Sequence, residues 1–411
     1  MTRATSLTSS WKRGNHFFIH LRVWCLILLM TGIMGCKSKP FPAAQGERTL
    51  SLEEIYASVS QKVHASHESA SRAALRGWVH DTLSPPAKRP ESFRRGISLG
   101  LFASTTNEEE QRAIYSKLLD EIESAGATDI SIVVRWSQDT VKTAEIGPAE
   151  GVTIDDALVR HVLRDAHRRG LRTFLMPIIW LKERKMGVWR GTLRPTDPER
   201  WWSQYTAFIH HYARLAQEEH VGLYSVGSEL LSMETKRERW IELIRSTRAI
   251  YHGDLTYSAN WDHFEVPTFW DELDVVGMTA YQELGLTRDP GMEDLARGWA
   301  PFVQRLSIWA REHDYRYIFT EIGYPSHSRG AAYPWNYSAS AEVDHVLQAK
   351  CYAAMFEQWH EDDRLEGLYI WNWFGFRDRS DRGYTPRGKL AEEVLKHWYA
   401  PSSPPPAIDK Q

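Results

Sequence analysis

The sequence predicts an α/β fold, a (β/α)8 TIM barrel, in which eight parallel strands alternate with helices and close on themselves. Three observations lead to this prediction. The chain has 411 residues, 42% of them hydrophobic, which is enough for one barrel of ordinary size and two flanks. Between residues 95 and 400, short apolar runs alternate with longer amphipathic stretches, as in βαβ units. No GxGxxG motif follows the first run, which disfavours the alternative of a doubly wound open sheet.

The predicted strands are short apolar runs whose residue types suit strands that are buried on both faces. They span residues 97–102, 129–135, 172–178, 221–227, 255–259, 274–279, 317–321 and 367–372. The predicted helices are the amphipathic stretches between and after them, which would cover the outside of the barrel. They span residues 108–125, 155–169, 198–218, 237–252, 293–313, 341–361 and 388–399.

Residues 1–36 have the pattern of an export signal rather than of a folded element. Four basic residues precede the apolar run VWCLILLMTGIMG, whose length of about 13 residues is short for a transmembrane helix. The run leads into GIMGC, which resembles the lipobox of bacterial lipoproteins and implies lipidation of Cys36. We therefore expect a lipid anchor at a bacterial cell envelope, with an uncleaved signal anchor as the alternative.

Charge and cysteine content argue against several kinds of partner. Residues 1–36 hold four of the 50 Lys and Arg residues and none of the 53 Asp and Glu residues, so the remaining chain has a net charge of −7. This balance disfavours nucleic-acid binding, which needs clustered basic side chains. Cys36 and Cys351 remain after signal removal, and lipidation of Cys36 leaves no disulfide framework. The 17 His residues show no metal-ligand spacing, so we expect neither a metal nor another cofactor.

The two flanks of the predicted barrel differ from it in composition. Residues 37–94 begin as a polar tether and continue as a helix that starts at a capping box, Ser51 with Glu54. This helix would either hold the barrel away from the membrane or pack beneath it. Residues 401–411 form a Pro-rich tail that cannot join a core. The predicted domain is therefore one barrel over residues 95–400, and we expect a monomer.

Two carboxylates at the ends of predicted strands suggest where the chemistry lies. Glu229 follows the fourth strand in YSVGSEL, and Glu321 ends the seventh in YIFTEI. A carboxylate is rarely buried without a polar partner, and barrel enzymes place their reacting groups at the C-terminal ends of the strands. Both side chains are therefore expected in one cleft at that rim. Two acids that act on one bond suggest glycoside hydrolysis, with retention if their carboxyl groups lie about 5 to 5.5 Å apart.

Several segments are similar to the clan A retaining glycoside hydrolases and, within that clan, to family 113, the β-mannanase family. They are YSVGSELL, RWIELIRSTRAIYHGDLTYSANWDHF, FWDELDVVGMTAYQEL, YIFTEIGYPS, GLYIWNWFG and YTPRGKLAEEVLKHWY. The resemblance implies that Glu229 is the acid/base and Glu321 the nucleophile. Ser228 stands where many clan members have an Asn that binds the sugar 2-hydroxyl, and family 113 resembles this sequence in having a small hydroxyl residue there. This position leaves open how mannose is distinguished from glucose.

Other polar residues near strand ends are candidates for the same cleft. Tyr281, after the sixth strand, is expected to donate its hydroxyl to Glu321 and keep that carboxyl ionised, or else to pack a loop. Arg135, on the second strand, would lower the pKa of the same carboxyl or form a structural ion pair. Because the general acid needs a raised pKa and the nucleophile must stay ionised, the surroundings of the two glutamates are expected to differ.

Aromatic residues near strand ends are candidates for sugar contacts, because sugar rings present apolar C–H faces. Trp371, next to Asn372 at the end of the eighth strand, is the expected floor of the reacting subsite, as the resemblance to clan A implies. Trp373 either joins this surface or belongs to the core. Four residues after the second, third and fifth strands would line further subsites or pack in the core: Trp136, Trp180, Asn260 and Trp261.

The predicted function is that of a retaining endo-β-1,4-mannanase that acts on a polysaccharide or oligosaccharide. One alternative keeps the same mechanism on another β-linked glycan, with both glutamates present and different subsite residues. The other alternative is a non-catalytic envelope lipoprotein that binds glycans, which would need the aromatic residues but not two acids. The presence of both Glu229 and Glu321 disfavours this second alternative.

Overall fold

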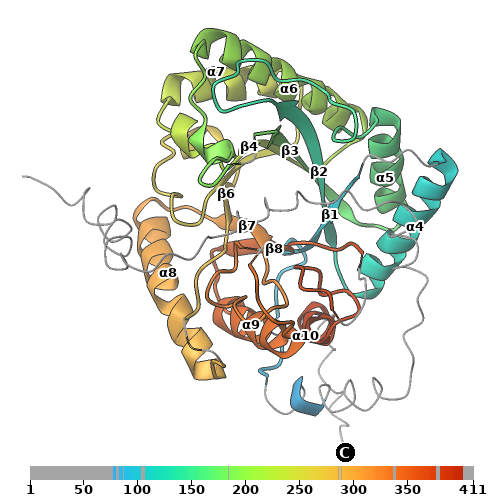
Figure 1. Ribbon diagram of the computed structural model, residues 1–411, viewed down its shortest axis with the longest axis vertical. Helices are drawn as coiled ribbons and strands as arrows, with labels where there is room; N and C mark the ends of the chain where they lie inside the picture. The colour runs from blue at the N-terminus through green and yellow to red at the C-terminus, as the bar shows by residue number, and fades with distance from the viewer. Residues whose placement is uncertain are drawn as a thin grey trace, which may run out of the picture. The chain divides into compact units, whose positions relative to one another are not determined.

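The computed structural model describes residues 77–79, 83–86, 88–102, 107–183, 185–285, 287, 289–336, 339–375 and 380–400. Eight strands in this part of the chain form a closed barrel, in which each strand is parallel to its neighbours and β8 pairs with β1 (Figure 1). They are β1 (Arg94–Gly100), β2 (Asp129–Gln138), β3 (Arg172–Leu181), β4 (Leu223–Ser228), β5 (Asp254–Ala259), β6 (Val276–Thr279), β7 (Tyr317–Ile322) and β8 (Leu365–Ile370). The predicted (β/α)8 barrel is confirmed.

Helices surround the strands, as Figure 1 shows. The α-helices of the described residues are α4 (Glu108–Ser124), α5 (Asp156–Arg168), α6 (Pro198–Glu218), α7 (Arg237–Arg248), α8 (Met292–Glu312), α9 (His345–Trp359) and α10 (Leu390–Tyr399). Between β5 and β6 the chain forms a 3-10 turn, η3 (Trp270–Glu272), where the sequence also predicted no helix. The predicted helices are all present with small shifts at their ends. Helix α9 begins four residues after its predicted start because the Asp344 side chain caps it, accepting from the Leu347 N–H.

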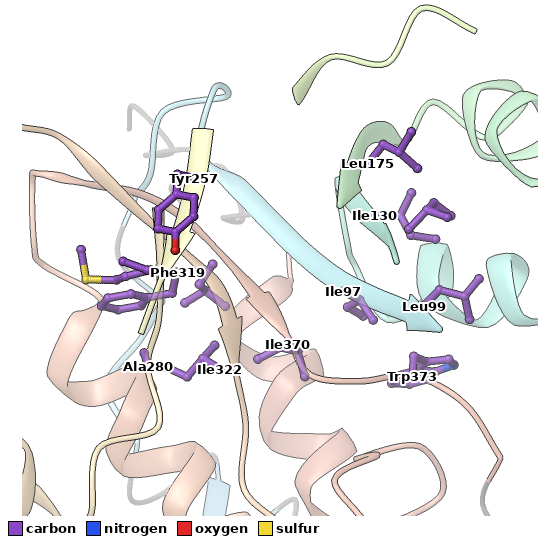
Figure 2. Packing of buried hydrophobic residues seen from close by; sticks show 14 of the residues in the cluster. Ile97, Leu99, Ile130, Leu175, Tyr257, Ala280, Phe319, Ile322, Ile370 and Trp373 are labelled. Atoms are coloured by element: carbon purple, nitrogen blue, oxygen red, sulfur yellow. The ribbon is translucent and has the colours of Figure 1, made fainter. Parts of the chain in front are cut away.

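Two layers of apolar side chains hold the barrel together. One layer lies between the strands and the helices and includes Ile97, Leu99, Ile130 and Leu175 (Figure 2). The second layer fills the inside of the barrel and consists of Val133, Phe174, Met176, Ile178, Leu223, Val275, Ile318 and Tyr369, with Trp371 against it. Because successive side chains of a strand point to opposite faces, a residue two positions beyond an inner one also faces inward. This rule decides which strand-end residues reach the cleft.

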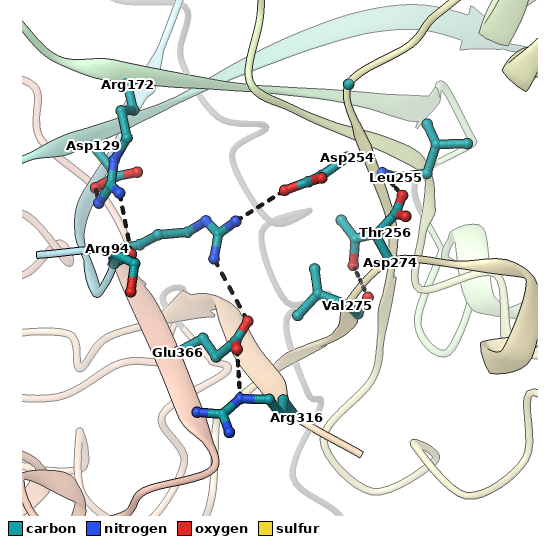
Figure 3. A network of polar contacts seen from close by, with 12 residues as sticks. Arg94, Asp129, Arg172, Asp254, Leu255, Thr256, Asp274, Val275, Arg316 and Glu366 are labelled. Carbon is teal, nitrogen blue, oxygen red and sulfur yellow. Dashed lines mark hydrogen bonds and ion pairs between the residues drawn. The ribbon is translucent and has the colours of Figure 1, made fainter. Parts of the chain in front are cut away.

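Ion pairs cross the N-terminal ends of the strands (Figure 3). The Arg94 guanidinium, from β1, lies 3.3 Å from Asp254 of β5 and 3.8 Å from Glu366 of β8. Arg316 pairs with the same Glu366 at 2.6 Å, and Arg172 of β3 pairs with Asp129 of β2, also at 2.6 Å. Because these ion pairs join strands on different sides of the barrel, the network stabilises its N-terminal end. The C-terminal ends of the strands remain available for binding and catalysis.

The described part of the N-terminal flank packs beneath the barrel. Val79 and Leu83 are buried in the main core, and the backbone and hydroxyl of Ser84 donate to the Glu357 carboxylate of α9 at 2.6 and 2.8 Å. For these residues, packing beneath the barrel is therefore the correct one of the two predicted arrangements. The signal segment with Cys36, most of the predicted flanking helix and the Pro-rich tail lie outside the described residues. Within the described residues, no helix is both long and apolar enough to cross a membrane.

Candidate active site

Glu229 and Glu321 both lie at the C-terminal rim of the barrel. Glu229 follows the last residue of β4, and Glu321 is the penultimate residue of β7, with 4% of its surface exposed. The pairing of β4 with β5 shifts register between Ser225 and Ser228, and that of β7 with β8 shifts between Phe319 and Ile322. Such irregularities re-aim side chains and are common beside active sites.

The Glu229 carboxylate is held by an arginine that sequence reasoning missed. Arg190, in the turn η1 (Arg190–Thr192) between β3 and α6, donates from Nη2 to Glu229 Oε2 at 2.7 Å. Its Nε also donates to the carbonyl of Ser228 at 3.2 Å. The backbone of Glu229 has φ +53°, in the left-handed region that is uncommon for residues other than glycine, and its N–H donates to Ser258 of β5 at 2.8 Å. Glu229 is thus fixed through both its carboxylate and its backbone.

The surroundings of Glu321 differ from those of Glu229. The Tyr281 hydroxyl donates to Glu321 Oε2 at 3.1 Å, which is the predicted contact, and Oε1 has no hydrogen-bond partner among the described residues. Burial and the nearby charge of Glu229 raise the pKa of Glu321 to about 8, although Arg190 and Tyr281 act to lower it. Two neighbouring carboxylates resist double ionisation, so the pair shares one proton at neutral pH.

This raised pKa corrects the sequence prediction that Tyr281 keeps the Glu321 carboxyl ionised. Glu229 is ion-paired with Arg190, whereas Glu321 is buried and receives one hydrogen bond, so burial dominates at Glu321. Arg135 was expected to supply the positive charge near Glu321. Its guanidinium instead lies over the Trp180 ring, 4.8 Å from the centroid, and Arg190 is the arginine that lowers the pKa of Glu321.

Comparison with known proteins agrees with this arrangement. The sequence profile described as Glycoside Hydrolase Family 113 matches residues 98–388, well over half of the chain. The chain belongs to glycoside hydrolase family 113. It is therefore a glycoside hydrolase that acts on a polysaccharide or oligosaccharide, and the mechanism of its family is the retaining double displacement. A search of curated protein sequences gave no match.

Solved structures agree with the fold. The GH113 β-mannanase of Alicyclobacillus acidocaldarius is 24% identical, with a TM-score of 0.66, and the match covers 75% of this chain and 97% of that one. A second structure, of a GH113 β-1,4-mannanase, is 23% identical with a TM-score of 0.67 and covers 75% and 98% of the two chains. A β-glucuronidase of Faecalibacterium prausnitzii is 14% identical with a TM-score of 0.51, over 75% of this chain and 49% of that one. At these identities the likeness concerns the fold.

Two predicted aromatic residues of this family 113 hydrolase lie at the top of the barrel interior. Trp180 is partly exposed on β3, six residues after the inner Phe174 and therefore on the same face. Trp371 is partly exposed after β8 and packs against the inner layer, and its peptide bond to Asn372 is cis. Both positions are suitable for the floor or wall of a sugar-binding cleft.

Two other predicted tryptophans do not face this cleft. Trp373 is 1% exposed and lies in the layer beneath the helices, with its indole N–H 3.4 Å from Glu121 of α4 (Figure 2). The core is therefore its place, rather than the substrate surface. Trp136 packs against Phe208 and Tyr212 of α6, so packing rather than a subsite is the correct one of its two predicted roles. The physical reason is strand alternation, because Arg135 faces inward and its neighbour must face outward.

The remaining predicted residues surround the rim. Asn260 and Trp261, partly exposed after β5, are linked by a hydrogen bond from the Trp261 N–H to Asn260 Oδ1 at 3.0 Å. Ser228 is 2% exposed, and its hydroxyl has no hydrogen-bond partner among the described residues. Sequence reasoning missed Trp335, which lies in the loop after β7, is 48% exposed and donates to Glu283 at 3.3 Å. In the described part of the chain, no group of three or more His, Cys, Asp or Glu side chains is arranged to hold a metal ion.

Proposed function

We propose that this family 113 hydrolase is an endo-β-1,4-mannanase, with Glu229 as acid/base and Glu321 as nucleophile. The observation that supports the assignment most directly is the pair of carboxylates with different surroundings, one paired with Arg190 and the other buried against Tyr281. Retaining glycosidases need two such groups, one that exchanges a proton and one that attacks. The β-mannanases of the same family that share this fold support the choice of mannan.

The mechanism proceeds in two steps. Glu321 attacks the anomeric carbon while Glu229 protonates the departing glycosidic oxygen, and the glycosyl group is transferred to Glu321. Glu229, now ionised, then removes a proton from a water molecule whose oxygen attacks the anomeric carbon. The bond to Glu321 breaks, and the sugar is released with retained configuration. The shared proton must therefore be on Glu229 before attack.

Aromatic side chains at the rim support an extended substrate. Trp371 and Trp180 lie at the top of the barrel interior, and Trp335 exposes almost half of its surface on the β7 loop. Its indole N–H is fixed by Glu283, and its ring lies edge-on to Tyr333 with centroids 5.9 Å apart. A rigid, exposed indole offers a flat apolar face for a sugar ring of a bound chain.

A substrate panel tests this function. The purified protein is incubated with β-mannan, glucomannan, xylan and mixed-linkage glucan, and new reducing ends are measured, with E321A as the control for contaminating activity. We expect products from mannan and glucomannan, with an early fall in the viscosity of glucomannan because internal bonds are cut. Cleavage of xylan or mixed-linkage glucan alone would assign the same mechanism to another β-glycan. Binding without cleavage would favour the non-catalytic alternative.

We also propose that a lipid on Cys36 anchors the enzyme to a bacterial cell envelope. The support is the sequence of residues 1–36, an apolar run that leads into GIMGC. In the C36S variant the enzyme should move from the membrane fraction to the soluble fraction of the producing cells. Continued membrane association of C36S would instead indicate an uncleaved signal anchor.

A further inference from the structure

Glu234 is a buried carboxylate that the proposed mechanism does not use. It follows the 3-10 turn η2 (Leu231–Met233), five residues after Glu229, and is fully buried. Its Oε1 accepts a hydrogen bond from the Tyr257 hydroxyl of β5 at 2.8 Å, while Oε2 has no hydrogen-bond partner among the described residues. Burying a carboxyl group with a single partner is costly. A specific role next to the site would account for its presence.

The Tyr257 hydroxyl connects Glu234 to the backbone beside Glu229. The hydroxyl oxygen accepts the N–H of Leu230, the residue directly after Glu229, at 2.9 Å. A tyrosine hydroxyl has one proton to donate, and Glu234 receives it. The oxygen lone pairs therefore remain available for the Leu230 N–H. Glu234 thus determines the orientation of the Tyr257 hydroxyl.

These contacts act on a strained part of the backbone. Glu229 has φ +53°, which is unfavourable for a residue with a side chain and persists where its surroundings hold it. The N–H groups of Glu229 and Leu230 bind the consecutive β5 residues Ser258 and Tyr257, respectively. Gly227 also lies close to Tyr257, since a Cβ atom there would be 3.0 Å from the Tyr257 ring. The chain therefore lies against Tyr257 both before Glu229, at Gly227, and after it, at Leu230.

We propose that Tyr257 and Glu234 are positioning residues that hold the backbone at Leu230 and so place the Glu229 carboxyl for proton transfer. This inference rests on the proposed role of Glu229 as acid/base. Burial, with a smaller contribution from the charge of Glu229, raises the pKa of Glu234 to about 7, although Tyr257 and His263 act to lower it. Glutamine is then a close substitute for the neutral acid, because its amide oxygen can accept the same hydroxyl proton.

Misplacing an acid/base has a recognisable kinetic effect. Protonation matters for a poor leaving group such as phenol and little for dinitrophenol, and kcat/KM reports the first, glycosylation step. General acid catalysis typically contributes about 10²- to 10⁴-fold, so partial misplacement in Y257F should lower kcat/KM for the phenyl glycoside by about 10- to 100-fold. The dinitrophenyl glycoside should lose less than about threefold, because its departure needs little protonation.

The experiment compares phenyl and dinitrophenyl β-glycosides of the sugar that the wild-type enzyme cleaves best. The variants are Y257F, E234L, which lacks the acceptor, and E234Q, which keeps it. Y251F is the matched control, because the Tyr251 hydroxyl is also buried and hydrogen-bonded to the backbone, but it donates to the carbonyl of Val221 at 2.7 Å, before the start of β4. We expect Y257F and E234L to become more dependent on the leaving group, and E234Q and Y251F to keep the wild-type dependence. Thermal unfolding identifies any variant that fails to fold. If Y257F does not fold, E234L alone tests the inference.

E229A separates two kinds of failure. If E229A depends strongly on the leaving group while Y257F and E234L lose activity equally on both substrates, or lose none, the positioning inference is wrong and the acid/base assignment stands. If E229A itself loses activity equally on both substrates, the assignment of Glu229 is wrong and the inference falls with it.

Discussion

Replacing Glu321 by glutamine should change how the stability of the protein depends on pH. The folded protein holds a proton on this carboxyl up to a pKa of about 8, whereas an unfolded glutamate loses it near its ordinary value of 4.5. Between these values the folded state binds more protons than the unfolded state, so the free energy of unfolding falls as pH rises. The full slope is about 1.4 kcal/mol per pH unit, and from pH 5 to pH 8 the loss comes to roughly 3 kcal/mol.

The E321Q variant cannot lose this proton, so its stability should lack that part of the pH dependence. Urea unfolding followed by tryptophan fluorescence at pH 5, 6, 7 and 8, at constant ionic strength, gives the free energy of unfolding for both proteins. The difference between E321Q and the wild type should move in favour of E321Q by roughly 3 kcal/mol across this range. E110Q, at an exposed position in the first turn of α4, is the control for the substitution itself. A difference that stays constant from pH 5 to pH 8, or that moves the other way, would refute the raised pKa of Glu321.

Four further predictions follow from the same structure. The kcat/KM of the wild type should fall above pH about 8, where the pair loses its shared proton, and R190Q should move this limb to higher pH because Arg190 lowers the pKa of Glu321. With an activated aryl glycoside and azide, E229A should give the glycosyl azide of retained β-configuration and E321A the inverted α-product, as chromatography and NMR would show. W335A should raise KM for the polymer by about 2- to 10-fold and leave short aryl glycosides unaffected, since one stacked sugar contact is lost. R94M should lower the free energy of unfolding by roughly 1–2 kcal/mol, measured in urea, and leave kcat unchanged because Arg94 lies at the far end of the barrel.

The sequence was sufficient to predict the barrel and the location of its two central carboxylates. A parallel barrel places every strand end at one rim, so an apolar run that stops at Glu229 or Glu321 indicates the position of the side chain as well. Tyr281 could be predicted for the same reason, because it lies two residues after the end of β6, beside the strand that carries Glu321.

The unresolved and missed assignments have two physical origins. The role of Trp136 was left open between a subsite and the core because only its place at a strand end was considered; the inward direction of the neighbouring Arg135 would have decided for the core. Arg190 and Trp335 lie in loops, where no periodic pattern relates a residue number to a direction in space. The raised pKa of Glu321 could not be predicted, since it depends first on how deeply the carboxyl is buried and then on the nearby charges of Glu229 and Arg190.

The N-terminal flank provides an attachment point on the side of the barrel opposite the catalytic rim. Ser84 is bound to the last turns of α9, and Arg172 at the start of β3 donates to the carbonyl of Phe93, so the chain enters beneath the strands. The lipid proposed at Cys36 would therefore be joined to the catalytic domain from the N-terminal side of the strands, opposite the rim that carries Glu229 and Glu321. The same geometry makes the N-terminal flank the suitable point for immobilising the protein on a solid support.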